Sequence, residues 1–142
     1  MASLPKYRYA LIDLMLPASE RATEMGFRGK ALHEATLTVL ALQRDHLEKG
    51  RYPASLDELM QAGYIASLPA DPYSDRPLLY RVADGAFTLY SVGPDFDDDG
   101  GTPGRDAEDQ PKLWGDKGDT VFWPVGPRVA PINSVVGVFL SD

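Results

Sequence analysis

The sequence predicts an α+β fold in which a long N-terminal helix packs on a small antiparallel β-sheet. The stretch between Pro17 and Gly50 is the longest without an internal proline, as expected for one long helix. Further along, short runs rich in Leu, Tyr, Val and Phe alternate with turn residues, which is typical of hairpin-connected strands. With 142 residues, we expect one domain, 1–142, that buries a modest core.

The first helix is expected at about 17–49. The apolar stripe that should pack on the sheet consists of Leu32, Ala35, Val39 and Leu42, widened by Leu40 and Leu47. The charged residues that should lie mostly off this stripe are Arg44, Asp45, Glu48 and Lys49. Gly26 and Gly29 each cost about 1 kcal/mol relative to alanine within a helix, so they predict a bend or break before Lys30.

A short second helix is expected at about 56–62, within "RYPASLDELMQAGYI". Ser55 and Glu58 have the spacing of a capping box, in which each side chain accepts a free backbone N–H of the other residue. Gly63 is well placed to end the helix. The prolines that follow predict an extended, non-helical chain and are Pro69, Pro72 and Pro77.

The sheet and an acidic loop are expected at about 78–125. "LLYRVADGAFTLYSV" reads as two strands joined at Asp84-Gly85, a dipeptide that accepts positive φ in a tight hairpin. "TVFWPV" is a third strand, and Pro124 places it at an edge or ends its pairing. "SVVGVFL" is a candidate fourth strand within a C-terminal extension, 126–142, to which we assign no role.

Negative charge is concentrated in one segment. The chain carries a net charge of −7, and nine acidic and three basic residues between Asp95 and Asp119 account for −6 of it. Because the chain lacks a basic surface, we exclude nucleic-acid binding. The absence of cysteine excludes disulfides and thiolate metal sites.

The acidic loop has the spacing of a linear calcium-binding loop. Counting from Asp95, aspartates occupy positions 1, 3, 5 and 12, the last three being Asp97, Asp99 and Asp106, and Gly100 occupies position 6. Clustered carboxylates repel one another unless a cation neutralises them. Calcium prefers six to eight oxygen ligands, whereas zinc favours His or Cys, which the loop lacks. The alternative is a solvated acidic turn without a metal.

The helix-loop-helix form of a calcium site is not expected here. Position 8 is Thr102 rather than an aliphatic residue, and position 12 is Asp rather than the longer Glu. A strand leads into the loop, and the residues that argue against an exiting helix are Pro103, Gly104 and Pro111.

The order of motifs resembles a known family. After the long helix come "EKGRYPASLDEL", "LPADPYSDRPLLYRV", "LYSVGPD", "DDGG" and "GDTVFWP". Together they resemble the soluble domain of the type II secretion major pseudopilin, within the type IV pilin-related superfamily, over roughly Leu32 to Trp123. The residues that match the family pattern are Gly50, Tyr52, Pro53, Leu56, Leu59, Asp71, Pro72, Pro77, Tyr80, Ser91, Gly93, Asp95, Gly100, Gly101 and Asp119.

The resemblance implies a structural role in a pseudopilus-like or other secretion assembly of the cell envelope, outside the cytoplasm, with other subunits as partners. It also implies a calcium ion in the loop between the last strands, with Asp95 and Asp119 as ligands and Ser91 in the matching "SxGxD" motif. Whether Asp106 or Asp119 closes the site stays open. "YALIDLML" only faintly matches the family's apolar helix and reaches Pro17, so we expect any membrane anchor to lie outside this chain.

No enzymatic motif is present, and we expect no catalysis. His33-Glu34 begins like a zinc-protease motif, but Leu37 stands where the second histidine belongs. His33 is expected at the surface, and His46 near the helix end, where its charge suits the helix dipole. The aromatic residues near the strands are expected to fill the core and are Tyr80, Phe87, Tyr90, Trp114 and Trp123. If they were exposed instead, the rival function would be a calcium-dependent protein- or carbohydrate-recognition domain of a larger cell-envelope protein.

Overall fold

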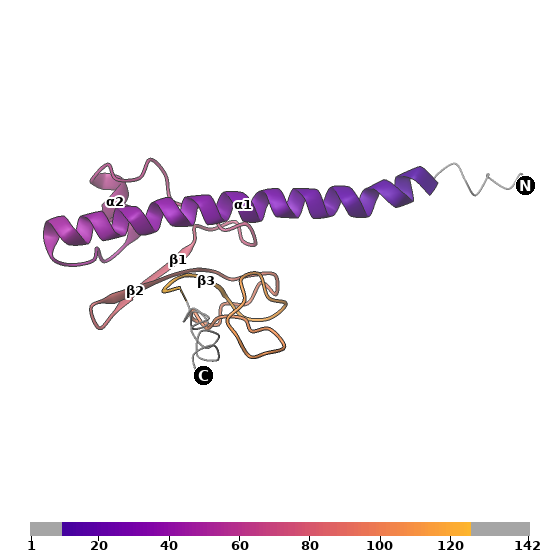
Figure 1. The fold of residues 1–142 in the computed structure, drawn as a ribbon. Coiled ribbons are helices and arrows are strands. Elements are labelled where there is room, and N and C mark those ends of the chain that lie inside the picture. The colour runs from indigo at the N-terminus through magenta and orange to yellow at the C-terminus, as the bar shows by residue number, and fades with distance from the viewer. Residues whose placement is uncertain (1–9, 126–142) are drawn as a thin grey trace, which may run out of the picture.

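The chain folds as an α+β structure with a long helix on one side of a three-stranded antiparallel sheet (Figure 1). The computed structural model describes residues 10–125, and side chains from Ser19 onward. The elements are α1 (Ala10–Lys49), α2 (Leu56–Gln61), β1 (Leu79–Ala83), β2 (Ala86–Ser91) and β3 (Thr120–Trp123). The N-terminal part of α1 extends beyond the sheet and its loops (Figure 1). The predicted fold class is confirmed.

Helix α1 begins earlier than predicted and is unbroken. It runs over 40 residues, so Pro17 lies within the helix rather than at its start. Neither Gly26 nor Gly29 interrupts it, and a Cβ atom at either position would meet no atom within 4 Å. The two glycines therefore cost only their intrinsic propensity, about 1 kcal/mol each, which the surrounding helix-forming residues outweigh.

The buried face of α1 differs from the predicted stripe. Leu32, Leu40 and Leu47 are 44%, 60% and 84% exposed, so they do not pack in the core. Ala35 and Leu42 of the predicted stripe are buried. The other buried residues of the helix are Ala31, Thr38, Ala41 and Asp45. The small side chains on this face let the helix approach the sheet closely. The placement of Asp45 on the wet face was also wrong, because Asp45 is fully buried and forms an ion pair with Lys49.

Helix α2 follows a turn and packs through Leu56 and Leu59. The predicted capping box forms only in part. The side chain of Ser55 makes no capping hydrogen bond, while Oε1 of Glu58 accepts the backbone N–H of Ala54 at 3.0 Å. The helix ends at Gln61, one residue before the predicted end, and Gly63 then adopts a φ of 77°.

The sheet has the order β1-β2-β3, with β2 in the centre. The predicted hairpin is confirmed: Asp84 and Gly85 adopt φ values of 52° and 75°, the left-handed conformation that a tight two-residue turn needs. β3 lies at an edge and ends directly before Pro124, as predicted. The candidate fourth strand "SVVGVFL" lies outside the described residues.

The core lies between α1 and one face of the sheet. Phe87 and Leu89 of β2 join Leu42 of α1 and Phe122 of β3 in a single buried cluster. Four of the five aromatic residues contribute to it as predicted: Phe87 belongs to the cluster, and the half-buried ones that pack against it are Tyr80, Trp114 and Trp123. Tyr90 is buried as well, but it lies outside this cluster. His33 is exposed, whereas His46 stacks on Tyr52 with ring centroids 4.2 Å apart. Among residues 10–125, no helix combines the length and the apolarity needed to cross a membrane.

Candidate metal site in the acidic loop

The acidic loop, residues 92–119, connects β2 to β3 and lies against the sheet face opposite α1. On β2, Thr88 and Tyr90 alternate with the core residues Phe87 and Leu89, so they point away from the helix. A Cβ atom at Gly101 would lie 3.2 Å from Thr88 and 3.5 Å from Tyr90, which places this part of the loop directly on the strand. The sheet is therefore covered on both faces, by α1 and by the acidic loop.

Hydrogen bonds fix the loop in place. Arg81 of β1 donates from Nη1 to the backbone oxygen of Gly100 at 2.6 Å. The Tyr90 hydroxyl donates to Oδ1 of Asp98 at 3.1 Å, and burial followed by this hydrogen bond raises the pKa of the hydroxyl. The backbone N–H of Asp119 donates to the oxygen of Thr102 at 2.9 Å. These bonds join the middle of the loop to the sheet and to the start of β3.

Two glycines allow the loop to close on itself. A Cβ atom at Gly104 would lie 2.3 Å from the backbone oxygen of Lys117, and one at Gly118 would lie 2.8 Å from the nitrogen of Gly104. Gly118 also has a φ of 81°, which side chains disfavour. The close approach of these backbone segments places Asp119 beside residues 99–104.

Asp119 is a buried carboxylate in an acidic environment. It is fully buried, and its side chain accepts the backbone N–H of Asp99 at 3.3 Å and that of Gly101 at 2.7 Å. Burial raises its pKa, the two N–H groups lower it, and the charges of Asp98 and Asp99 raise it further. Within residues 19–125, no basic side chain forms an ion pair with it. The fold thus gives this carboxylate hydrogen bonds but no countercharge.

Asp95 lies next to the same backbone segment. Its Oδ2 accepts the N–H of Gly118 at 2.8 Å, and its Oδ1 accepts the N–H of Asp97 at 3.4 Å. Asp95 is half-buried, whereas Asp97 and Asp99 are exposed. The fold therefore brings Asp95 to the residue directly before Asp119, although 23 positions separate Asp95 from Gly118 in the sequence.

The other two predicted ligands lie in different surroundings. Oδ1 of Asp106 accepts the N–H groups of Glu108 and Gln110 at 3.0 and 2.9 Å, so its carboxylate closes a local turn. Ser91 is buried and donates from Oγ to Oδ1 of Asp71 at 2.7 Å. Among the described residues, neither side chain forms a hydrogen bond with Asp95 or Asp119.

The carboxylates of the loop do not form a ready-made metal centre. In the part of the chain that the structure describes, no three His, Cys, Asp or Glu side chains come together as a metal-binding group. Asp95 and Asp119 nevertheless suit a hard cation, because both are carboxylates in adjoining segments and Asp119 lacks a countercharge. The exposed carboxylates of Asp97 and Asp99 and backbone carbonyls of the loop are the oxygens available to complete such a shell.

Asp71 is another buried aspartate near the loop, and the sequence analysis gave it no site role. Asp71 is 4% exposed; its Oδ1 accepts the Ser91 hydroxyl and the N–H of Tyr73, and its Oδ2 accepts the N–H of Val92 at 3.2 Å. We call Asp71, Tyr73, Ser91 and Val92 the Asp71 cluster. The Asp71-Pro72 pair was the available signal, since Asp before Pro often begins a turn in which the carboxylate accepts backbone N–H groups.

An aromatic group lies at one end of the acidic loop. The ring of Tyr73 contacts Phe96 and Trp114, with centroids 5.9 and 5.7 Å away, and the Arg28 guanidinium lies 5.6 Å from the Trp114 ring. Phe96 and Trp114 have φ values of 63° and 60°, and Phe96 is 68% exposed. Sequence reasoning placed Trp114 in the core but did not single out Phe96, because a left-handed aromatic residue has no sequence signature.

No protein family, curated protein or solved structure matches this chain in the three comparisons.

Proposed function

We propose that this chain is a structural subunit or domain of a pseudopilus-like envelope assembly, and that calcium bound through Asp95 and Asp119 stabilises its acidic loop. The motif resemblance supplies the class of protein. The observation that carries the calcium proposal is the burial of Asp119 beside Asp98 and Asp99 without an ion pair among the described residues. A buried carboxylate in such surroundings is stabilised either by a proton or by a cation.

The geometry favours Asp119 over Asp106 as the residue that closes the site. Asp119 accepts N–H groups from Asp99 and Gly101, within the predicted calcium loop itself. Asp106 uses its carboxylate on the turn at residues 106–110. Asp97 and Asp99 are exposed side chains near Asp95 in sequence and supply further oxygens at low conformational cost.

Calcium in this position acts structurally. It offsets repulsion among the loop carboxylates and orders a loop that covers Tyr90 and Thr88. Because the ion binds the folded state, it adds about 2.7 kcal/mol of stability when its free concentration is a hundredfold above the dissociation constant. The ordered loop then offers neighbouring subunits a defined surface. In this proposal the chain works outside the cytoplasm.

Thermal unfolding tests the calcium proposal. The midpoint is measured in chelator, in millimolar calcium and in millimolar magnesium, for the wild type and for Asp95→Ala. We expect a calcium-specific rise that Asp95→Ala lacks. Asp116→Ala is the matched control, since Asp116 is an exposed aspartate of the same loop whose side chain makes no hydrogen bond or ion pair within residues 19–125, and it should keep the rise. A wild-type midpoint that is equal in chelator and calcium would contradict the proposal.

A test of assembly follows from the same variant. If calcium orders the surface that neighbouring subunits contact, Asp95→Ala should reduce incorporation of the full-length protein into its assembly. Asp116→Ala should not. Assembly that is unchanged by Asp95→Ala would count against a structural role for the loop.

The second candidate is a calcium-dependent recognition domain of a larger cell-envelope protein. The observation that favours it is the exposed, left-handed Phe96 beside Tyr73 and Trp114, because strained exposed aromatics often mark ligand contacts. The full-length gene separates the two candidates: a pilin-type leader followed by an apolar helix favours assembly, and unrelated upstream domains favour recognition.

A further inference from the structure

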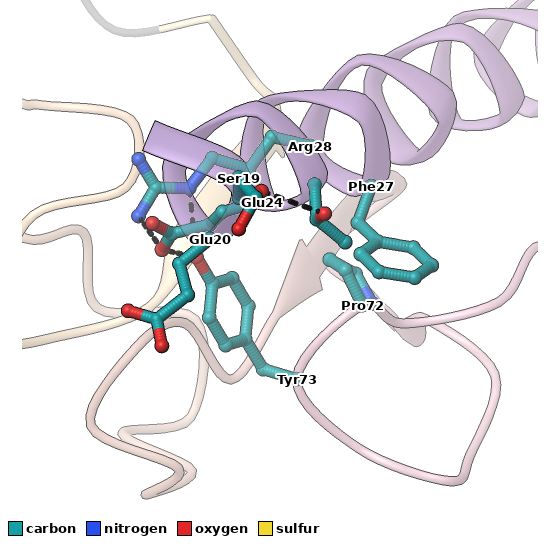
Figure 2. A pocket seen from close by; sticks show the side chains of 8 residues that line it. Ser19, Glu20, Glu24, Phe27, Arg28, Pro72 and Tyr73 are labelled. Carbon is teal, nitrogen blue, oxygen red and sulfur yellow. Dashed lines mark hydrogen bonds and ion pairs between the residues drawn. The ribbon is translucent and has the colours of Figure 1, made fainter. Parts of the chain in front are cut away.

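A surface groove lies between the N-terminal half of α1 and the loop at Pro72 and Tyr73, and its lining includes none of the predicted calcium ligands. It has a volume of about 370 Å³. Figure 2 shows the Phe27 ring facing Pro72 on one side, and Tyr73 below Glu24 and Arg28 on the other. Its walls thus combine apolar rings with carboxylates from successive turns of α1.

Part of the groove is held rigidly. Oε1 of Glu24 accepts from the Tyr73 hydroxyl at 2.9 Å and pairs with Nη2 of Arg28 at 2.6 Å, while Nε of Arg28 donates to the same hydroxyl at 2.7 Å (Figure 2). Tyr73 is in turn held by Asp71 through its backbone N–H. The groove is therefore preformed, and its floor does not depend on a ligand.

Glu20 gives the groove an unused negative charge. Glu20 lies one helical turn before Glu24 and is exposed. Among the described residues, its side chain makes neither a hydrogen bond nor an ion pair. Glu24 is already paired with Arg28, so the lining keeps a net charge of about −1 at neutral pH. An occupant that complements the groove carries a basic side chain next to aromatic or aliphatic groups.

Residues 1–9 of the chain have this chemistry. The sequence "MASLPKYRY" contains Lys6 and Arg8, next to Tyr7 and Tyr9, and it has no acidic residue. Its charge opposes that of the groove, and its tyrosines match the apolar walls formed by Phe27, Pro72 and Tyr73. A basic nonapeptide of this composition fits the groove by both charge and polarity.

Chain length favours a contact between two copies over one within a single copy. Helix α1 begins at Ala10, so Glu20 and Glu24 lie about 15 and 21 Å along its axis at 1.5 Å per residue. If the segment before Ala10 turned back along α1 and were fully extended, the Cα atom of Arg8 would lie about 7 Å from Ala10 along the axis, and that of Lys6 about 14 Å. Even with the length of the side chains added, Lys6 and Arg8 approach Glu20 of their own copy only if the chain reverses sharply at Ala10, whereas the groove of a second copy carries no such constraint.

We propose that the groove at Glu20 and Tyr73 binds residues 1–9 of a second copy of this chain. The contact is heterologous, because the segment of one copy meets the groove of another, and repetition of it builds a row of subunits. The inference rests on the proposed function in placing the chain in an assembly, but it does not depend on calcium.

Charge-reversal variants of the full chain test this contact by sedimentation equilibrium at low ionic strength. The wild type should self-associate, and Glu20→Lys should weaken the association about tenfold. The double variant Lys6→Glu/Arg8→Glu should weaken it similarly. Added salt should reduce the wild-type association, since exposed charges are screened. Glu108→Lys is the matched control, with the same charge change at an exposed position that does not line the groove, and should leave association intact.

Mixing the two defective proteins gives the sharpest test. The Glu20→Lys protein keeps an intact segment, and the Lys6→Glu/Arg8→Glu protein keeps an intact groove. The mixture should therefore form hetero-oligomers although neither protein associates strongly alone, because the intact segment meets the intact groove and the two reversed charges also attract each other. A wild type that stays monomeric, equal association of Glu20→Lys and Glu108→Lys, or a mixture without hetero-oligomers would each overturn the proposal.

The same experiments separate this inference from the proposed function. If the wild type does not self-associate but its unfolding midpoint rises in calcium, the groove contact is overturned and the calcium proposal stands. If the wild type self-associates in chelator and its unfolding midpoint does not respond to calcium, the calcium proposal is overturned and the groove contact stands. Unchanged unfolding midpoints of Glu20→Lys and of the double variant ensure that a loss of association is not a loss of folding.

Discussion

The molecule contains two buried aspartates near the end of β2 and the start of β3, and they differ in what surrounds the carboxylate. Asp71 accepts a hydroxyl and two backbone N–H groups, all from neutral donors. Asp119 also accepts two N–H groups, but it faces the negative charges of Asp98 and Asp99. In the Asp71 cluster, neutral donors of the chain satisfy the buried carboxylate. At Asp119, the neighbouring charges are negative and no countercharge balances the carboxylate.

The neighbouring charges distinguish a structural carboxylate from a candidate metal ligand. Both residues are buried, so burial alone does not distinguish them. The deciding property is the sign of the neighbouring charges, because a carboxylate among carboxylates gains from a cation whereas a carboxylate with a full set of neutral donors does not.

The largest effect is expected for Asp71→Ala. The substitution leaves the Ser91 hydroxyl and the N–H groups of Tyr73 and Val92 without their acceptor, so the free energy of unfolding should fall by about 3 kcal/mol. Denaturant unfolding should show this loss equally in chelator and in calcium. Ser91→Ala removes one of the three contacts and should cost about 1 kcal/mol. An Asp71→Ala loss that calcium reverses would break the contrast.

The calcium increment should disappear in Asp119→Asn. Asparagine keeps the size of the side chain and one acceptor oxygen, but it removes the negative charge that attracts the cation. In chelator the variant should stay within about 1 kcal/mol of the wild type, because the loss of one of the two N–H hydrogen bonds is offset by relief of repulsion from Asp98 and Asp99. In calcium the wild type should gain about 2.7 kcal/mol at a hundredfold excess over its dissociation constant, and the variant nothing.

The pH dependence of stability provides an independent check on Asp119. Its pKa in the folded state lies above the ordinary value of 3.8, so the folded state binds the proton more tightly than the unfolded chain does. In chelator, its contribution to stability is fully present below pH 3.8 and is lost as the pH rises through the folded-state pKa. Denaturant unfolding across this range should show that loss in the wild type and not in Asp119→Asn.

Calcium should reverse this dependence, because the ion binds the ionised carboxylate and lowers its pKa. In calcium, therefore, the wild type should gain stability relative to Asp119→Asn as the pH rises. Identical pH profiles of the two proteins in chelator would show that Asp119 is not the buried acid described above.

The smallest effect is expected for Asp106→Ala. Its carboxylate accepts two N–H groups in an exposed local turn, so its loss should cost less than about 1 kcal/mol. The rise of the thermal midpoint in calcium should persist. If Asp106→Ala abolished that rise while Asp119→Asn kept it, Asp106 rather than Asp119 would close the site.

Much of the fold was predictable because its signals are local. The hairpin depended on Asp84-Gly85, which adopts positive φ in almost any context. The edge position of β3 followed from Pro124, which lacks a backbone donor. The packing face of α1 was not predictable in the same way, since apolar residues occur on two sides of the helix. The small residues Ala31 and Ala35 pack on the sheet, while Leu40 and Leu47 remain exposed.

The candidate site was predictable only in part. Sequence spacing singled out the acidic loop and Asp95, and the motif resemblance added Asp119. The sequence did not predict the separate turn at Asp106 or the hydrogen bond between Ser91 and Asp71, because residue spacing does not encode these contacts.

The sequence by itself determined the order of the elements, the tight hairpin and the concentration of negative charge between β2 and β3. These depend on backbone propensities and composition, which act over a few residues. Only the tertiary structure decided which carboxylates are buried and what surrounds each of them. The reason is that Gly104 and Gly118 permit two distant backbone segments to meet, and this contact places Asp119 beside Asp99 and Gly101.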